Sequence, residues 1–120
     1  MKEDNQIVEK SKAFAIRIIR MYQHLNKMKQ EYILSKQVLR SGTSIGANVK
    51  EANSAQTRAD FTAKMQIALK ETSETEYWLE LLMETGYITE KEGESILTDC
   101  QELLKMITAI LKSTKASQAQ

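Results

Sequence analysis

The sequence predicts an all-α protein that folds as an antiparallel up-down-up-down four-helix bundle. The chain has no proline and only 4 glycines, whereas an all-β fold with many turns needs both residue types. Apolar residues recur at alternating spacings of three and four in several separate segments. With 120 residues, 42% of them hydrophobic, the chain suits one domain with a core. We therefore expect a bundle over residues 1–112 and a disordered polar tail over residues 113–120.

The first helix is predicted from about residue 6 to residue 28, because its apolar residues follow a heptad stripe. Two further residues, Ile19 and Tyr22, widen the stripe as a bundle helix requires. The stripe itself consists of Ile7, Ser11, Phe14, Ile18, Met21, Leu25 and Met28.

The second helix is predicted from Gln30 to Asn53 on the stripe Leu34, Val38, Ile45, Val49 and Ala52. The small residues between Ser41 and Gly46 could form a loop, since glycine costs ~1 kcal/mol against alanine in a helix. The periodicity stays in phase across them, so one continuous helix is preferred. Gly42 and Gly46 then share a face and allow a neighbouring backbone to approach. A P-loop is excluded because the pattern is not GxxxxGK[ST] and no strand precedes it.

The third helix is predicted from about Arg58 to Thr85, after a loop over residues 54–58. Thr57 and Asp60 form a variant of the capping box at its start, and Gly86 ends it. Its stripe is Phe61, Met65, Ala68, Thr72, Thr75, Leu79 and Leu82, with Leu69 and Met83 alongside.

The fourth helix is predicted to start after Thr89, which forms a second capping box with Glu92, and to end near Lys112. Its stripe is Ile96, Cys100, Leu103, Ile107 and Ile110.

The residue counts exclude several kinds of site. One cysteine, Cys100, cannot form an internal disulfide or a cysteine zinc cage, and one histidine, His24, excludes His-rich metal sites. A di-iron bundle needs Glu-x-x-His pairs, but Met21 stands three residues before His24. We expect Cys100 to be a buried packing residue and His24 to suit the carboxyl end of the first helix. No metal, cofactor or catalytic residue is assigned.

Polar residues interrupt the second and third stripes at Asn48, Thr72 and Thr75. Buried polar groups must be hydrogen-bonded and often fix helix register. The candidate network joins Arg40, Asn48, Glu51, Glu71 and Glu74, with Glu76 nearby. Register specification is preferred over a carboxylate-based catalytic cleft, for which no trio of nucleophile, base and orienting group can be named.

Trp78 lies beside the core stripe, because Leu79 and Leu82 occupy it. Tryptophan is enriched in interaction hot spots, so Trp78 and Leu81 are the candidate oligomer interface. A half-buried boundary role for Trp78 is the alternative.

Charge is uneven along the chain. Residues 1–53 hold 10 Lys and Arg against 5 Asp and Glu, whereas residues 54–120 hold 7 against 11. Attraction between the two helical hairpins is one interpretation, and a basic surface for RNA or for an acidic neighbouring subunit is the other. The candidate nucleic-acid-binding residues are Lys12, Arg17, Arg20, Lys27, Lys29, Lys36, Arg40 and Lys50.

The chain shows no targeting segment. Its first six residues are polar, and no apolar run approaches the ~20 residues that span a bilayer. We expect a cytoplasmic protein with no membrane partner.

Residues 34–52 and 67–82 resemble the two signatures of the four-helix bundle proteins encoded in 23S rRNA intervening sequences, and the similarity extends over about residues 10–112. This family is similar to the accessory protein of diversity-generating retroelements, a barrel-shaped homopentamer that engages a reverse transcriptase and nucleic acid. The resemblance implies a bundle fold, homo-oligomerisation and an RNA-linked role, and it implies no catalysis.

These observations favour a non-enzymatic, homo-oligomeric interaction protein, with itself as the main partner and a pentamer as one outcome. The alternative is an RNA-binding protein that uses the basic first hairpin. No small-molecule substrate is identified.

Overall fold

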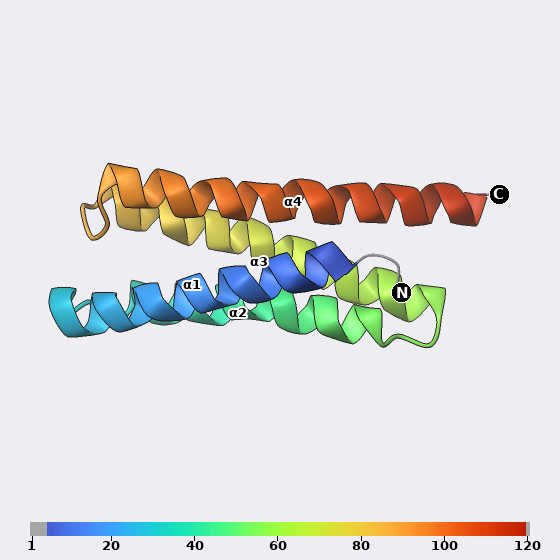
Figure 1. The fold of residues 1–120 in the computed structure, drawn as a ribbon, viewed down its shortest axis with the longest axis horizontal. Helices are drawn as coiled ribbons and strands as arrows, with labels where there is room; N and C mark the ends of the chain where they lie inside the picture. The colour runs from blue at the N-terminus through green and yellow to red at the C-terminus, as the bar shows by residue number, and fades with distance from the viewer. Residues whose placement is uncertain (1–4, 120) are drawn as a thin grey trace.

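The chain forms four α-helices in a computed structural model that describes residues 5–119. They are α1 (Asn5–Lys29), α2 (Leu34–Asn53), α3 (Arg58–Glu84) and α4 (Glu90–Ala119). Successive helices run in opposite directions, as the colour ramp of Figure 1 shows. The predicted antiparallel four-helix bundle is confirmed.

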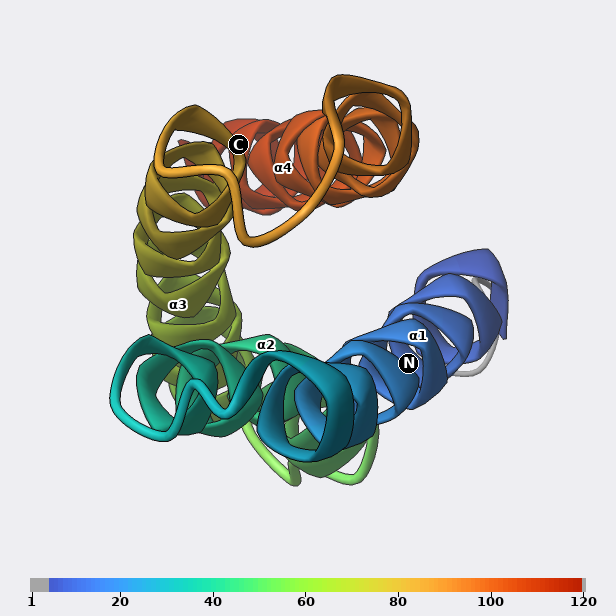
Figure 2. The ribbon, with the colours of Figure 1, turned by 90° about the vertical axis from the view of Figure 1, so that its left-hand side faces the viewer.

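The bundle is elongated, about 51 × 20 × 20 Å, and each helix packs mainly on its neighbour in sequence. Figure 2, viewed along the bundle, shows α1 beside α2, α2 beside α3 and α3 beside α4. The contact between α1 and α4 is the least extensive of the four. The bundle is therefore more open between its first and last helices than elsewhere.

The core follows the predicted stripes with two exceptions in α1. Every stripe residue of α3, from Phe61 to Leu82, is buried. In α1, however, Met28 is 65% exposed and Ile19 is also exposed. Met28 belongs to the last turn of α1 at the end of the bundle, and Ile19 is rotated by ~100° from the buried Ile18. Both were predicted in or beside the core, and both predictions are wrong.

The run of small residues from Ser41 to Gly46 is helical, as predicted. A Cβ added at Gly42 would lie 2.8 Å from Cγ1 of Ile18, and one at Gly46 would lie 3.3 Å from the backbone oxygen of Ser11. These two glycines therefore allow the close approach of α1 and α2.

Two helix ends differ from the prediction. Helix α2 begins at Leu34 rather than Gln30, because Gln30 adopts a left-handed conformation with φ 54°. Helix α4 continues beyond Lys112 to Ala119, where no glycine or proline interrupts it. Residues 113–119, predicted as part of the tail, thus extend this helix, and Gln120 lies outside the described residues.

The predicted caps of α3 and α4 are present. The Thr57 hydroxyl accepts the Asp60 N–H at 3.1 Å, and Thr89 and Glu92 bond each other reciprocally at 3.0 and 3.1 Å. Gly86 adopts the left-handed φ of 82° that ends α3.

Candidate functional site

One end of the bundle carries both the α1–α2 turn (residues 30–33) and the α3–α4 turn (residues 85–89), at the left of Figure 1. We call it the turn end. Three large apolar side chains are exposed there: Met28 at 65%, Tyr32 at 51% and Ile33 at 75%. Ile33 is the most exposed large hydrophobic residue in the described chain. These three residues fall within residues 28–33, whereas the other exposed large hydrophobic residues of the described chain lie along α1 and α3: Ile16, Ile19, Ile67 and Tyr77. Grouped apolar side chains mark an interaction site more often than scattered single residues do.

The α1–α2 turn is held in one conformation by Glu31. Its buried carboxylate accepts the backbone N–H groups of Ile33 at 3.1 Å, Leu34 at 2.9 Å and Ser35 at 2.7 Å. Burial alone would raise the pKa of Glu31, but these hydrogen bonds, that of Leu34 foremost, lower it overall. The turn thus presents Tyr32 and Ile33 from a fixed backbone.

The turn end is also divided by charge. Exposed lysines occupy the last turn of α1 and the first turn of α2: Lys27, Lys29 and Lys36. Exposed glutamates stand where α3 ends and α4 begins, at Glu84 and Glu90. The apolar cluster therefore has a basic side and an acidic side.

Part of the predicted polar network forms between α2 and α3. The Arg40 guanidinium donates to Glu71 at 3.2 Å and also to Glu74, which accepts the indole N–H of Trp78 at 3.0 Å. The bond from Trp78, followed by that from Arg40, lowers the pKa of Glu74. Below this cluster the Thr75 hydroxyl donates to Ser41 at 2.8 Å. These contacts fix the register of the two helices.

Two residues of the predicted network lie outside it. Asn48 donates to the carbonyl of Ser44 within α2 at 2.9 Å, and Glu51 pairs with Lys64 at 2.9 Å. Asn48 thus bonds within its own helix, and Glu51 joins α2 to α3 through Lys64 rather than through Arg40, so neither residue belongs to the predicted network. Glu76 accepts a bond from Gln101 of α4 at 3.1 Å.

Replacing Arg40 by methionine is expected to lower the free energy of unfolding by about 1–2 kcal/mol. The Glu71 side chain is only 12% exposed and its Oε1 already has no hydrogen-bond partner in the described structure, so Arg40→Met leaves a poorly solvated carboxylate. Urea denaturation followed by Trp78 fluorescence measures the loss. Lys64→Met is the matched control, because Glu51 is 57% exposed and such a pair contributes ~0–1 kcal/mol. Equal losses in both variants would contradict the assignment.

The candidate nucleic-acid-binding residues divide into paired and unpaired groups. Arg17 pairs with Asp99 at 2.6 Å, and Arg40 belongs to the network above. Within the described residues, no ion pair is formed by the other six: Lys12, Arg20, Lys27, Lys29, Lys36 and Lys50. The candidate interface residues Trp78 and Leu81 are half-buried, and their role in an interface stays a prediction.

Cys100 is buried, as predicted, and its Sγ lies 3.5 Å from the carbonyl of Thr72. Burial, with the charges of Glu76 and Glu80, raises the pKa of the Cys100 thiol to about 12, so the thiol stays protonated. Over residues 5–119 no three acidic, cysteine or histidine side chains gather as metal ligands would. In the same range no helix is long and apolar enough to cross a membrane.

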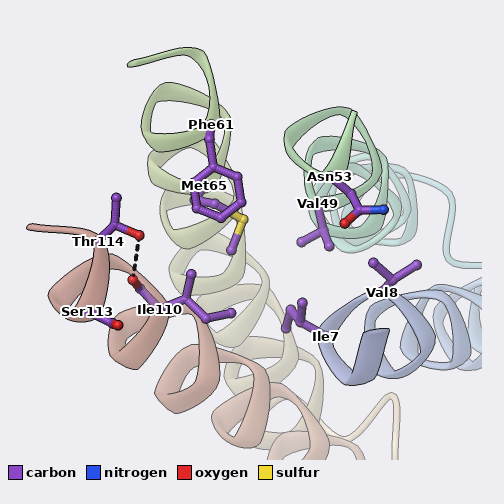
Figure 3. Close-up of a pocket in the computed structure, with 9 residues that line it drawn as sticks. All are labelled: Ile7, Val8, Val49, Asn53, Phe61, Met65, Ile110, Ser113 and Thr114. Atoms are coloured by element: carbon purple, nitrogen blue, oxygen red, sulfur yellow. Dashed lines mark hydrogen bonds between the residues drawn. The ribbon is translucent and has the colours of Figure 1, made fainter. Parts of the chain in front are cut away.

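An apolar cavity of about 170 Å³ lies at the end opposite the turn end. Figure 3 shows side chains from all four helices around it. Ser113 and Thr114 line it because α4 continues past Lys112, and the Thr114 hydroxyl donates to the carbonyl of Ile110 at 2.9 Å. The other lining residues are Ile7, Val8, Val49, Asn53, Phe61, Met65 and Ile110.

Sequence reasoning missed the turn end. Tyr32 and Ile33 fall inside the predicted second helix, where two apolar residues beside a stripe do not indicate an exposed surface. The available signal was their position between two stripes, Met28 and Leu34 being the nearest members on either side. Two consecutive large apolar residues in an inter-helix connection indicate a surface contact.

The chain was compared with known proteins. The family model described as 23S rRNA-intervening sequence protein matches residues 3–109. A crystal structure of a protein with unknown function from the S23 ribosomal protein family of Bacteroides thetaiotaomicron has a TM-score of 0.87 and 54% sequence identity. That match covers 88% of this chain and 98% of the other. A search of curated proteins finds no match.

Proposed function

Starting from the fact that the chain belongs to the 23S rRNA-intervening sequence protein family, we propose that it is a non-enzymatic module that binds other copies of itself. The observation that carries the proposal is the exposed apolar cluster of Met28, Tyr32 and Ile33 on a rigid turn. The left-handed conformation of Gln30 has a free-energy cost, and backbone strain of this kind persists where the surface is used.

A second copy is the occupant that the charges favour. The lysines beside the apolar cluster in one copy complement Glu84 and Glu90 beside the cluster in the next. Contact between the basic side of one copy and the acidic side of another is heterologous, and heterologous contacts form a ring where their rotation closes. The family resemblance implies homo-oligomerisation, and a pentameric ring is one such assembly.

Two further features support the non-catalytic, intracellular part of the proposal. The cysteine is protonated and buried, and the carboxylates of Glu31, Glu74 and Glu92 have lowered rather than raised pKa values. A lone free thiol suits a reducing compartment such as the cytoplasm.

The proposal is tested by the molar mass in solution, measured by light scattering on a sizing column at moderate salt. We expect the wild type at a small multiple of 13.7 kDa, and Tyr32→Ser/Ile33→Ser at or near the monomer mass. The matched control is Tyr77→Ser/Ile67→Ser, since these residues of the same two types are 55% and 41% exposed on α3. A monomeric wild type, or an assembly that persists in Tyr32→Ser/Ile33→Ser, would contradict the proposal.

RNA binding is the second candidate, and the six unpaired basic side chains of α1 and α2 favour it. Under this alternative, structured RNA binds with an affinity that falls steeply between low and moderate salt, because phosphate contacts release counterions. Affinity that is negligible, or flat across that range, speaks against it.

A further inference from the structure

Along α1, two residues one heptad apart form ion pairs with α4, whereas the residue at the next heptad position forms none. Lys10 pairs with Glu102 at 3.0 Å, and Arg17 pairs with Asp99 at 2.6 Å. One heptad further along α1 stands His24, and the facing carboxylate on α4 is Glu92. In the described structure no ion pair joins them.

The Glu92 side chain caps the start of its own helix. Its carboxylate accepts both the backbone N–H and the hydroxyl of Thr89, each at 3.0 Å. The neighbouring residue Lys91 then faces the same space as Arg20 of α1. Arg20 and Lys91 thus border one groove, which His24 and the Glu92 carboxylate also line, and neither cation has an ion-pair partner among residues 5–119.

The groove is large enough for a small molecule and has an apolar floor. Its volume is about 640 Å³, within the ~300–1,000 Å³ typical of ligand sites. Met21, Ile88 and Ile96 form the floor, and Ile88 and Ile96 are buried. At one end Arg17 pairs with Asp99 at 2.6 Å and donates to the Ser95 hydroxyl at 3.2 Å, so its guanidinium is held at this wall of the groove.

We propose that this groove between α1 and α4 binds a small organic phosphate with a flat apolar group, the class that includes nucleoside monophosphates. The phosphate takes the place of the missing third ion pair, between Arg20, His24 and Lys91. Arginine and lysine are the usual phosphate partners. The apolar group lies on Met21, Ile88 and Ile96, where the thioether of methionine packs well against aromatic rings. The groove adjoins the self-association surface, because Ile88 belongs to the α3–α4 turn and Lys91 follows Glu90.

AMP is the probe, with inorganic phosphate and adenosine as its two halves. In a ¹H–¹⁵N NMR titration of the full chain, we expect AMP to shift the backbone amides of Met21, Ile88, Ser95 and Ile96. Affinity for AMP should exceed that for either half by about tenfold or more, since charge and apolar surface both contribute. Equal affinity for inorganic phosphate would overturn the ligand class, and shifts elsewhere or none at all would overturn the site.

Matched charge-reversal variants distinguish AMP binding in the groove from nonspecific attraction of AMP to basic side chains. Arg20→Glu/Lys91→Glu should weaken AMP binding by about tenfold or more, whereas Lys12→Glu/Lys36→Glu, with the same charge change outside the groove, should change it less than about threefold. All four side chains are exposed, so the variants are expected to fold, which the dispersion of the same spectra verifies. Equal weakening in both double variants overturns the proposal. The proposal is also overturned if the amide signals of the groove residues shift with protein concentration before AMP is added, because a second copy of the chain then covers the groove.

Discussion

Gly42→Val is expected to lower the free energy of unfolding by about 3 kcal/mol, the upper part of the range for overpacked cores. The added Cβ would lie 2.8 and 2.9 Å from the two γ-carbons of Ile18, a β-branched side chain that is fully buried and has little freedom to move. Chemical denaturation measures the loss. Ala47→Val, on the exposed face of the same helix, should cost only the propensity difference, below ~1 kcal/mol.

A double-mutant cycle isolates the contact. In the wild type, Gly42→Ala should destabilise, because the gain in helix propensity does not offset the clash. In an Ile18→Ala background both γ-carbons are gone, so the same change should stabilise by up to ~1 kcal/mol. Additive effects in the cycle would show that the two residues are not coupled.

Glu31→Gln is expected to lower the free energy of unfolding by about 2 kcal/mol at neutral pH. The carboxylate accepts three backbone N–H groups at the start of α2. Glutamine places a donor amide against donors and removes the charge. Thermal or urea unfolding at pH 7 measures the loss, and Glu9→Gln, at an exposed position of α1, is the control with little expected effect.

The pH dependence of this loss has a defined sign. The pKa of Glu31 is lowered in the folded chain, so the stabilisation is fully present above the ordinary carboxyl pKa of ~4.3 and is lost as pH falls through the folded value. The gap in stability between wild type and Glu31→Gln should therefore narrow below about pH 4. A gap that stays constant down to pH 2 would show that the carboxylate charge is not what stabilises the turn.

Most of the bundle could be predicted from the sequence, because its core positions recur at helical spacing. The stripe of α3 from Phe61 to Leu82 was predicted without error. The start of α2 was not, because a side-chain carboxylate that caps three N–H groups leaves no periodic trace, and Gln30 rarely adopts a left-handed conformation. Met28 also continued the stripe of α1, but periodicity does not tell where neighbouring helices end.

The candidate sites were predicted less completely. Arg40, Glu71 and Glu74 were matched by heptad phase and do meet. The Thr89–Glu92 capping box was predicted and is present, but the groove between α1 and α4 was not predicted. Which side chains of α4 face those of α1 depends on how the two helices pack, and heptad phase within one helix does not give that.

The sequential packing of the helices has a consequence for how the chain folds. Because α1 packs on α2, α2 on α3 and α3 on α4, most native contacts join segments that are close in sequence. Little loop-closure entropy is lost before these contacts form, and topologies of this kind fold fastest. The approach of α1 to α4 closes the longest loop in exchange for the fewest contacts. It is therefore the step that the chain can complete last and reopen most readily without losing the rest of the bundle.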